Sequence, residues 1–354
     1  MNNSSAERSF STILIGAGQA GLSVARYLKE MGKEDFLILD EGPEIGSSWK
    51  NRYDSLELDS FAKYSHLEDF HFSGDKRKRP TKDEVADYLA LFAQQFGLQP
   101  IFNTKVTSIS KRNGEFIIGS EKGILYYAKS VVVATGPFHR EFIPALAANI
   151  GDSVLEIHSS EYKNPEELPT GSVLVVGGGN SGAEIAEEVA LSGRHVYFSY
   201  KGKLKSVGST HLHQWLAYRL GLAHLPKKSV LGSLAVWYTK GKAVGLDIKK
   251  LLGNHRIKTV GELVGIKDGT IFCKNLAIPL RDIETIIWAT GFVDDFSLIE
   301  VDEFDPKKVK RGVSNISGLY LINLRWHHSK SSSHLAGVSR DAKYIAQKIS
   351  AILD

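Results

Sequence analysis

The 354-residue chain contains a single cysteine, Cys273. One thiol excludes an intramolecular disulfide, a Cys-x-x-Cys redox pair and a metal site built from cysteines. The chain also has no apolar run near the roughly 20 residues that a membrane helix needs. Its first ten residues are polar and lack the features of a secretory signal. We therefore expect a cytoplasmic protein with no membrane partner.

Charge of one sign is not in excess either, because 44 Lys and Arg against 40 Asp and Glu give a net charge of +4. So small a value predicts no strong attraction to nucleic acid. One basic run, at residues 76–79, is interpreted as a solvated loop. The paired histidines, such as His327 and His328, lack the helical spacing with a carboxylate that zinc sites use, so no metal is expected.

Short runs of Val, Ile and Leu predict four strands, at residues 12–15, 36–39, 131–133 and 173–176. Such continuous apolar runs are typical of parallel strands buried on both faces. A helical pattern over 20–29 joins the first two strands, and the same order returns with a helix over 183–191 and a strand over 196–200. The two similar units predict an α/β fold with two Rossmann-like dinucleotide-binding domains.

The first unit has a Gly-x-Gly-x-x-Gly turn between its strand and its helix. The residues of the turn are Gly16, Ala17, Gly18, Gln19, Ala20 and Gly21. Its glycines permit a tight turn, close approach of a pyrophosphate and close helix packing, and the helix N-terminus offers free amides to phosphates. Asp40 and Glu41, at the end of the second strand, supply a carboxylate for ribose hydroxyls. These features predict a dinucleotide site.

The second unit repeats this turn with Gly177, Gly178, Gly179, Asn180, Ser181 and Gly182. The place that corresponds to Asp40 falls among Ser199, Tyr200 and Lys201, where there is no acid. Hydroxyls and Lys201 suit a 2′-phosphate, which a carboxylate would repel, so NADPH is favoured over NADH. A solvated loop is the alternative interpretation of Lys201.

Two dinucleotide sites in one chain indicate a flavoprotein in which a nicotinamide passes a hydride to FAD, whereas a simple dehydrogenase needs one nucleotide. We expect an FAD domain over residues 1–156 and 291–354, with an NAD(P)H domain over 157–290 inserted into it. A helix is expected over 82–96, and an antiparallel pair around Asn113-Gly114. Residues 205–256 are expected to be mostly helix and loop.

The order of motifs along nearly the whole chain resembles that of the class B flavin-dependent monooxygenases, especially small bacterial members and the plant YUCCA-type enzymes. Outside the two turns, the likeness lies in Gly46, Ser47 and Trp49 of a Gly-Gly-x-Trp-like segment, in the turns Ala134-Thr135-Gly136 and Ala289-Thr290-Gly291, and in the tail from Gly318 to Asp341. Ser47 replaces the second glycine of the family segment. The resemblance implies that these segments surround FAD and link the two domains.

The family's identifying linker, Phe-x-Gly-x-x-x-His, is matched by His158 but not by Asp152 and Val154, which replace its Phe and Gly. This departure weakens the inference to hydroperoxide chemistry. Baeyer–Villiger members usually carry Trp where Tyr162 stands, which disfavours insertion into ketones. Asp59 matches an acid near the flavin in those enzymes and keeps that chemistry as a minority option.

The resemblance implies an enzyme with FAD, NADPH and O2 as co-substrate, in which a C4a-hydroperoxide oxygenates a small substrate at sulfur or nitrogen. Asp59, His158 and Asn180 are the candidate catalytic residues, with cofactor positioning as their expected role. One alternative is a flavin reductase that passes electrons to a protein acceptor or to O2, and another is an accessory flavoprotein. A homodimer is compatible with the sequence, which does not reveal the oligomeric state.

Overall fold

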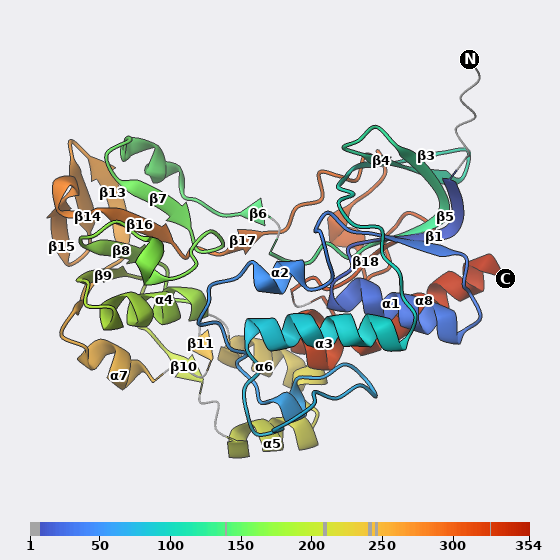
Figure 1. Cartoon of the computed structure of the whole chain (residues 1–354), viewed down its shortest axis with the longest axis horizontal. Helices are drawn as coiled ribbons and strands as arrows, with labels where there is room; N and C mark the ends of the chain where they lie inside the picture. Colours follow the sequence, from blue (N-terminus) through green and yellow to red (C-terminus); the bar gives the residue numbers. More distant parts are fainter. Residues whose placement is uncertain (1–7, 139, 208–210, 240–242, 245–246, 326) are drawn as a thin grey trace.

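The computed structural model describes residues 8–138, 140–207, 211–239, 243–244, 247–325 and 327–354. Its strands form two main sheets, one in each of two lobes that lie side by side (Figure 1). The expected α/β architecture is confirmed.

The first lobe is built on a six-stranded sheet in the order β2-β1-β5-β4-β3, with β18 also paired to β5. Its strands are β1 (Arg8–Ile15), β2 (Phe36–Leu39), β3 (Val106–Arg112), β4 (Glu115–Ser120), β5 (Leu125–Val133) and β18 (Leu319–Leu321). β1, β2, β5 and β18 are parallel to one another, whereas β4 runs antiparallel to both of its neighbours, β3 and β5. The β3–β4 hairpin turns at Asn113 and Gly114, which both have a positive φ, as a two-residue turn of this kind requires.

The second lobe contains a parallel sheet in the order β12-β9-β8-β16-β7. Its strands are β7 (Leu155–His158), β8 (Val173–Val176), β9 (Val196–Ser199), β12 (Ile257–Gly261) and β16 (Thr285–Trp288). Helix α4 (Asn180–Leu191) connects β8 to β9. An antiparallel sheet of β13 (Leu263–Lys267), β14 (Thr270–Cys273) and β15 (Leu276–Pro279) adds to this lobe and was not expected from the sequence.

The connection between the lobes is a pair of short strands, β6 (Arg140–Glu141) and β17 (Phe292–Val293), which Figure 1 shows between the two sheets. The expected domain boundary between residues 156 and 157 falls inside β7. Because β7 pairs with β16 along its whole length, the second sheet already includes Leu155.

The segment that follows β9 is mainly helical in its described part. It contains α5 (His211–Arg219), α6 (Val230–Thr239) and α7 (Ile248–Gly253), with the short strands β10 (Ser206–Val207) and β11 (Ala243–Val244). Single-turn 3-10 helices occur at η1 (Ala62–Tyr64), η2 (Ala145–Asn149), η3 (Pro165–Glu167), η4 (Leu222–His224), η5 (Leu280–Asp282), η6 (Pro306–Lys308) and η7 (Lys330–Ser333). Within the described residues, no helix is both long enough and apolar enough to cross a membrane.

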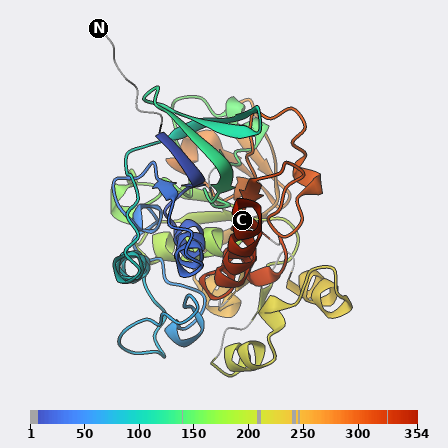
Figure 2. The same cartoon turned by 90° about the vertical axis from the view of Figure 1, so that its right-hand side faces the viewer.

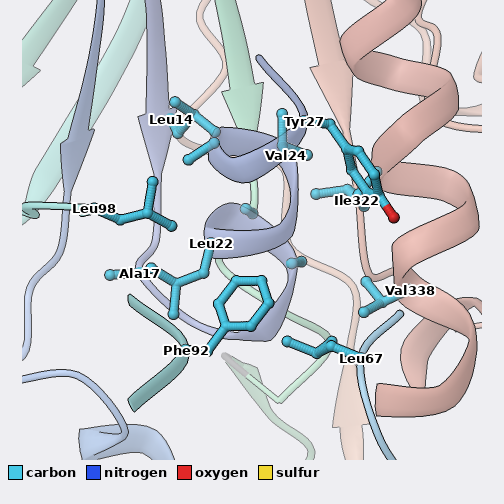
Figure 3. Packing of buried hydrophobic residues seen from close by; sticks show 14 of the residues in the cluster. Leu14, Ala17, Leu22, Val24, Tyr27, Leu67, Phe92, Leu98, Ile322 and Val338 are labelled. Carbon is cyan, nitrogen blue, oxygen red and sulfur yellow. The ribbon is translucent and has the colours of Figure 1, made fainter. Parts of the chain in front are cut away.

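The core of the first lobe holds three helices against the sheet, namely α1 (Gln19–Glu30), α3 (Lys82–Gln95) and α8 (Leu335–Leu353). Leu22 of α1, Phe92 of α3 and Val338 of α8 are all buried in one cluster with Leu14 of β1 (Figure 3). Burial of each such side chain contributes about 1.5–3 kcal/mol. The packing fixes the starts of α1 and α8, which both point toward the region between the lobes.

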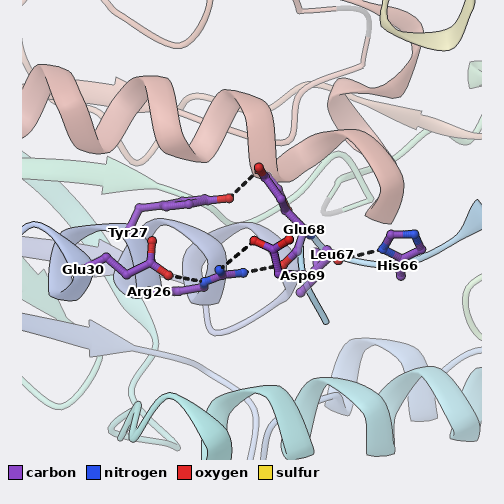
Figure 4. Close-up of polar contacts among 8 residues, drawn as sticks. Arg26, Tyr27, Glu30, His66, Leu67, Glu68 and Asp69 are labelled. Carbon is purple, nitrogen blue, oxygen red and sulfur yellow. Dashed lines mark hydrogen bonds and ion pairs between the residues drawn. The ribbon is translucent and has the colours of Figure 1, made fainter. Parts of the chain in front are cut away.

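A polar network ties the loop after η1 to helix α1 (Figure 4). Arg26, which is buried, donates to the Glu30 carboxylate at 2.6 Å and to the main-chain carbonyl of Glu68. The Tyr27 hydroxyl donates to the Glu68 carboxylate at 2.7 Å. These bonds hold residues 66–69 against the lobe, and with them the start of the loop that carries the basic run at 76–79.

Candidate functional site

A cleft of about 1780 Å³ lies between the lobes, and both glycine-rich turns open onto it. A pocket for a single drug-sized molecule typically measures about 300–1,000 Å³. The cleft therefore has room for more than one such molecule.

The first glycine-rich turn packs backbone against backbone. Gly16 has φ +109°, and a Cβ added to it would lie 2.5 Å from the carbonyl oxygen of Ala134. A Cβ on Gly21 would lie 1.9 Å from the carbonyl oxygen of Gly16. A Cβ on Gly18, which lines the cleft, would meet no atom within 4 Å. Gly16 and Gly21 thus permit the packing, while Gly18 leaves space open at the cleft wall.

The second turn has the same geometry. Gly177 has φ +130° and its added Cβ would lie 2.1 Å from the Ala289 carbonyl oxygen, while that of Gly182 would lie 1.9 Å from the Gly177 carbonyl oxygen. Gly179, like Gly18, would meet nothing within 4 Å. Helix α1 begins directly after Gly18 and α4 begins directly after Gly179, and neither helix start has a side-chain cap. The first amides of each helix are consequently available to an anion in the cleft.

Most of the predicted cofactor-binding residues line this cleft. They are Gly16, Gly18, Gln19, Ala20, Asp40, Glu41, Ser47, Trp49, Ala134, Thr135, Gly136, Gly177, Gly179, Asn180, Ser181, Tyr200, Lys201, Ala289, Thr290 and Gly291. Gly21 and Gly182, the last residues of the two turns, pack against backbone and do not line the cleft. Gly46 lies at the start of α2 (Ser47–Lys50), where its added Cβ would be 2.6 Å from the Cβ of Ala86, so it allows α2 to pack on α3.

Asp40 braces the first turn. Its carboxylate accepts hydrogen bonds from the amides of Ala17, at 2.6 Å, and Gly42, at 2.8 Å. The exposed Glu41 lies next to it on the cleft wall. On the other side of the turn, Gln19 donates to Asn323 at 3.2 Å, while its buried Oε1 accepts no hydrogen bond from the described protein groups. The turn therefore offers carboxylates and one unsatisfied acceptor to a hydroxyl-bearing ligand.

An acid that was not predicted from the sequence lies at the corresponding end of the second unit. Glu262, at the turn between β12 and β13, lines the cleft and lies 3.5 Å from the Lys201 ammonium and 2.7 Å from that of Lys274. The hydrogen bond from Lys274 lowers the pKa of Glu262. The positive charge of Lys201 thus lies beside the negative charge of Glu262, which follows a different strand.

Asp59 and Asn180, two of the predicted catalytic residues, are in contact across the cleft. The Asn180 amide, at the first residue of α4, donates to the Asp59 carboxylate at 2.7 Å. Asp59 opens to the cleft but is surrounded by protein on its other sides. This burial, followed by the negative charge of Glu184, raises its pKa to about 7. The carboxyl therefore changes its protonation state near neutral pH.

A second contact joins the same two elements. The Tyr53 hydroxyl donates to the carboxylate of Glu184, one turn further along α4. Burial raises the pKa of both groups, and Glu184 adds to the rise for Tyr53. The segment that carries Tyr53 and Asp59 in the first lobe is thus bonded to the start of α4 in the second lobe.

Lys330 and His334, which were not predicted from the sequence, line the cleft at the start of α8. His334 is exposed on the cleft side, but the protein around its imidazole lowers its pKa to about 4, with a further contribution from the charge of Lys330, so the imidazole is neutral at pH 7. Burial also lowers the pKa of Lys330. His224 and Ser331 line the cleft as well, and the Nδ1 of His224 lies 2.8 Å from the hydroxyl oxygen of Ser331, which joins η4 to η7.

His158, the third predicted catalytic residue, does not line the cleft. It is fully buried at the end of β7, where its Nδ1 lies 2.7 Å from the Ser160 hydroxyl and its Nε2 lies 3.0 Å from the Gly291 carbonyl oxygen. Burial lowers the pKa of the imidazole. The geometry gives His158 a place at the junction of the lobes, where it contacts the turn that carries Gly291.

Across the described part of the chain, no three His, Cys, Asp or Glu side chains are grouped as a metal ion would need.

Known proteins share this arrangement of sequence and fold. A family model described as pyridine nucleotide-disulphide oxidoreductase matches residues 13–228. The uncharacterized oxidoreductase CzcO of Bacillus velezensis is 36% identical over 96% of this chain and 99% of its own length. The chain belongs to the pyridine nucleotide-disulphide oxidoreductase family.

This family member is an oxidoreductase, and its expected likeness to flavin monooxygenases is confirmed. The probable indole-3-pyruvate monooxygenase YUCCA9 of Arabidopsis thaliana is 29% identical over 95% of this chain and 88% of its own length. The flavin-containing monooxygenase from Stenotrophomonas maltophilia has the same fold, with a TM-score of 0.78 over 98% of this chain and 99% of that chain at 21% identity. The family name refers to disulphides, but the one cysteine here, the buried Cys273, excludes a dithiol pair within the chain.

Proposed function

We propose that this oxidoreductase is an FAD- and NAD(P)H-dependent monooxygenase that oxygenates a small substrate at a nucleophilic sulfur or nitrogen atom. The observation that carries the proposal is the pair of glycine-rich turns with the same geometry on one cleft, because a hydride donor and a flavin each need such a turn. The YUCCA9 and Stenotrophomonas maltophilia relatives, which are named as monooxygenases, support the type of reaction.

The FAD site in this proposal is the first turn with its neighbours. The open side of Gly18 and the first amides of α1 suit the pyrophosphate, and the carboxylates of Asp40 and Glu41 suit ribose hydroxyls. The NAD(P)H site is the second turn, with Gly179 in the place of Gly18. Tyr200 and Lys201 lie where the adenosine ribose and its 2′-phosphate would bind. The lobes are then the FAD and NAD(P)H domains of the proposal.

The bound flavin supplies the redox chemistry and the activation of O2, and the protein positions the reactants and excludes water. Asn180 holds the Asp59 carboxyl at the meeting point of the two lobes. Near neutral pH that carboxyl carries or releases a proton at Oδ, which suits a reaction that consumes a proton. The net reaction converts NADPH, a proton, O2 and the substrate into NADP⁺, water and the substrate with one added oxygen atom.

The test measures NADPH consumption, O2 consumption and hydrogen peroxide release by the purified protein, with and without a panel of sulfides and amines. We expect at least one sulfide or amine to yield an oxygenated product and to lower the peroxide released per NADPH. If all consumed NADPH appears as peroxide with every compound, the proposed reaction is wrong and an oxidase or reductase is indicated.

A matched pair of variants tests the site. Asp59→Asn should lower product formation, whereas Asp54→Asn should not. Asp54 lies in the same loop but bonds Asn164 at 2.8 Å outside the cleft. Equal loss in both variants would show that the effect comes from the loop and not from the cleft carboxyl.

A further inference from the structure

Helix α5 presents an apolar stripe to solvent. Leu212, Trp215, Leu216 and Arg219 occur at the i, i+3, i+4 and i+7 spacing that places side chains on one face of a helix. Leu212 is 63% exposed, and Trp215 and Leu216 are exposed as well. A different side of the helix faces the protein, because Gln214 donates to the main-chain carbonyl of Asp59 and the Tyr218 ring lies 5.3 Å from that of Tyr64.

The apolar surface continues along the chain after α5. Leu220 and Leu222 follow it directly, and Val230, Leu231 and Leu234 are exposed on the first turns of α6. Figures 1 and 2 both show α5 and α6 in the lower part of the molecule, outside the two main sheets. Soluble monomers rarely expose so many large apolar side chains within one short segment.

Basic residues accompany this surface. Residues 205–250 contain eight Lys and Arg against one acid, Asp247. Lys227 and Lys228 are exposed between η4 and α6, and Arg219 lies over the Trp215 ring at 5.9 Å. The whole-chain charge of +4 does not reveal this local excess.

The basic run that the cofactor sites leave unexplained lies beside α5. The amide of Lys63 donates to the Lys76 carbonyl at 3.0 Å and that of Ala62 donates to the Lys78 carbonyl at 2.9 Å, which places the run along η1. η1 in turn contacts α5 through Tyr64 and Tyr218. Lys76 and Arg77 are exposed there. Because Tyr218 lies on the protein-facing side of α5, the basic run lies beside the helix and is not part of the apolar stripe.

We propose that this surface, made of the α5 stripe, the exposed Lys227 and Lys228 and the start of α6, docks on an anionic lipid bilayer. Exposed Leu and Trp side chains enter the interface between headgroups and acyl chains, while Lys and Arg meet anionic headgroups. A second copy is the less suitable occupant, because a two-fold axis through this surface would bring two strongly basic segments together. The docking is peripheral, and it does not depend on the proposed reaction.

The experiment is co-sedimentation of the purified full chain with vesicles of phosphatidylcholine alone or with about one third phosphatidylglycerol, at low and high salt. We expect binding to the anionic vesicles that weakens with salt, and little binding to the neutral ones. Lys227→Gln with Lys228→Gln should weaken binding about thirtyfold, since each basic residue near the surface contributes about fivefold. Leu212→Gln with Leu216→Gln should also weaken it.

The matched controls are Lys267→Gln and Leu191→Gln, which change residues that are 80% and 68% exposed on other surfaces. They should bind as the parent chain does, and circular dichroism should show that all variants are folded. Absence of binding by the parent chain to anionic vesicles would overturn the proposal. It would also be overturned if sedimentation in solution showed a dimer that the two Leu substitutions dissociate, while the vesicles bind nothing.

Discussion

The two open glycines, Gly18 and Gly179, allow the two cleft sites to be tested separately. A methyl group at Gly18 meets no protein atom within 4 Å, and the residue has an extended backbone that alanine adopts freely. Gly18→Ala should therefore fold, at a cost of about 0.5–1 kcal/mol for a poorer helix cap. Gly21→Ala should fail to fold, because its Cβ would lie 1.9 Å from the Gly16 carbonyl oxygen.

The new methyl of Gly18→Ala enters the space that the FAD pyrophosphate needs in our proposal. Overpacking of this kind costs about 1–3 kcal/mol, which is roughly a 5- to 150-fold loss of FAD affinity. Gly179→Ala should instead raise the KM for NADPH by a similar factor and leave the FAD content unchanged. Flavin absorbance after purification and titration of the apoprotein measure the first effect, and steady-state kinetics the second. Loss of FAD in Gly179→Ala with retention in Gly18→Ala would refute the assignment of the lobes.

Three further predictions concern single side chains. Because deprotonation of Asp59 adds a negative charge to the cleft, the KM for NADPH should rise as pH increases through about 7, and Asp59→Asn should give a flat pH profile. Glu262→Gln relieves Lys201 of its carboxylate partner and should lower the KM for NADPH about fivefold with little change for NADH, which kinetics with both nucleotides would check. Arg26→Met leaves the Glu68 carbonyl without this donor and should lower the free energy of unfolding by about 2 kcal/mol in urea denaturation, and an unchanged midpoint would contradict the role given to the network.

Local patterns were sufficient to predict the two nucleotide-binding units. The strands at 12–15 and 173–176 are buried on both faces, so their sequences are continuously apolar, and the turns after them need glycine for steric reasons that any such fold shares. The edge strand β7 is only partly buried and has no such signature, which is why the expected boundary fell inside it. In α6 the described exposed face is also apolar, so the usual alternation of polar and apolar faces is weak there.

The unexpected cleft residues come from places that are distant in sequence. Glu262 reaches the end of β9 only because β12 pairs beside it, and Lys330 and His334 reach the cleft because α8 packs on α1. No local motif marks these three residues. For His158 the local motif was present and predicted a site residue, but the fold buries its side chain at the junction of the lobes.

The contacts across the cleft make the ionised Asp59 carboxylate and a nucleotide phosphate compete for one helix end. Asp59 and Glu184 both lie near the start of α4, and their mutual repulsion contributes to the raised pKa of Asp59. The positive end of the α4 dipole stabilises whichever negative charge lies closest to it. A phosphate bound at Gly179 would occupy that end and add its own charge, which favours the protonated form of Asp59. Nucleotide binding should therefore take up a proton near pH 7, and by the same linkage a protonated Asp59 should strengthen nucleotide binding.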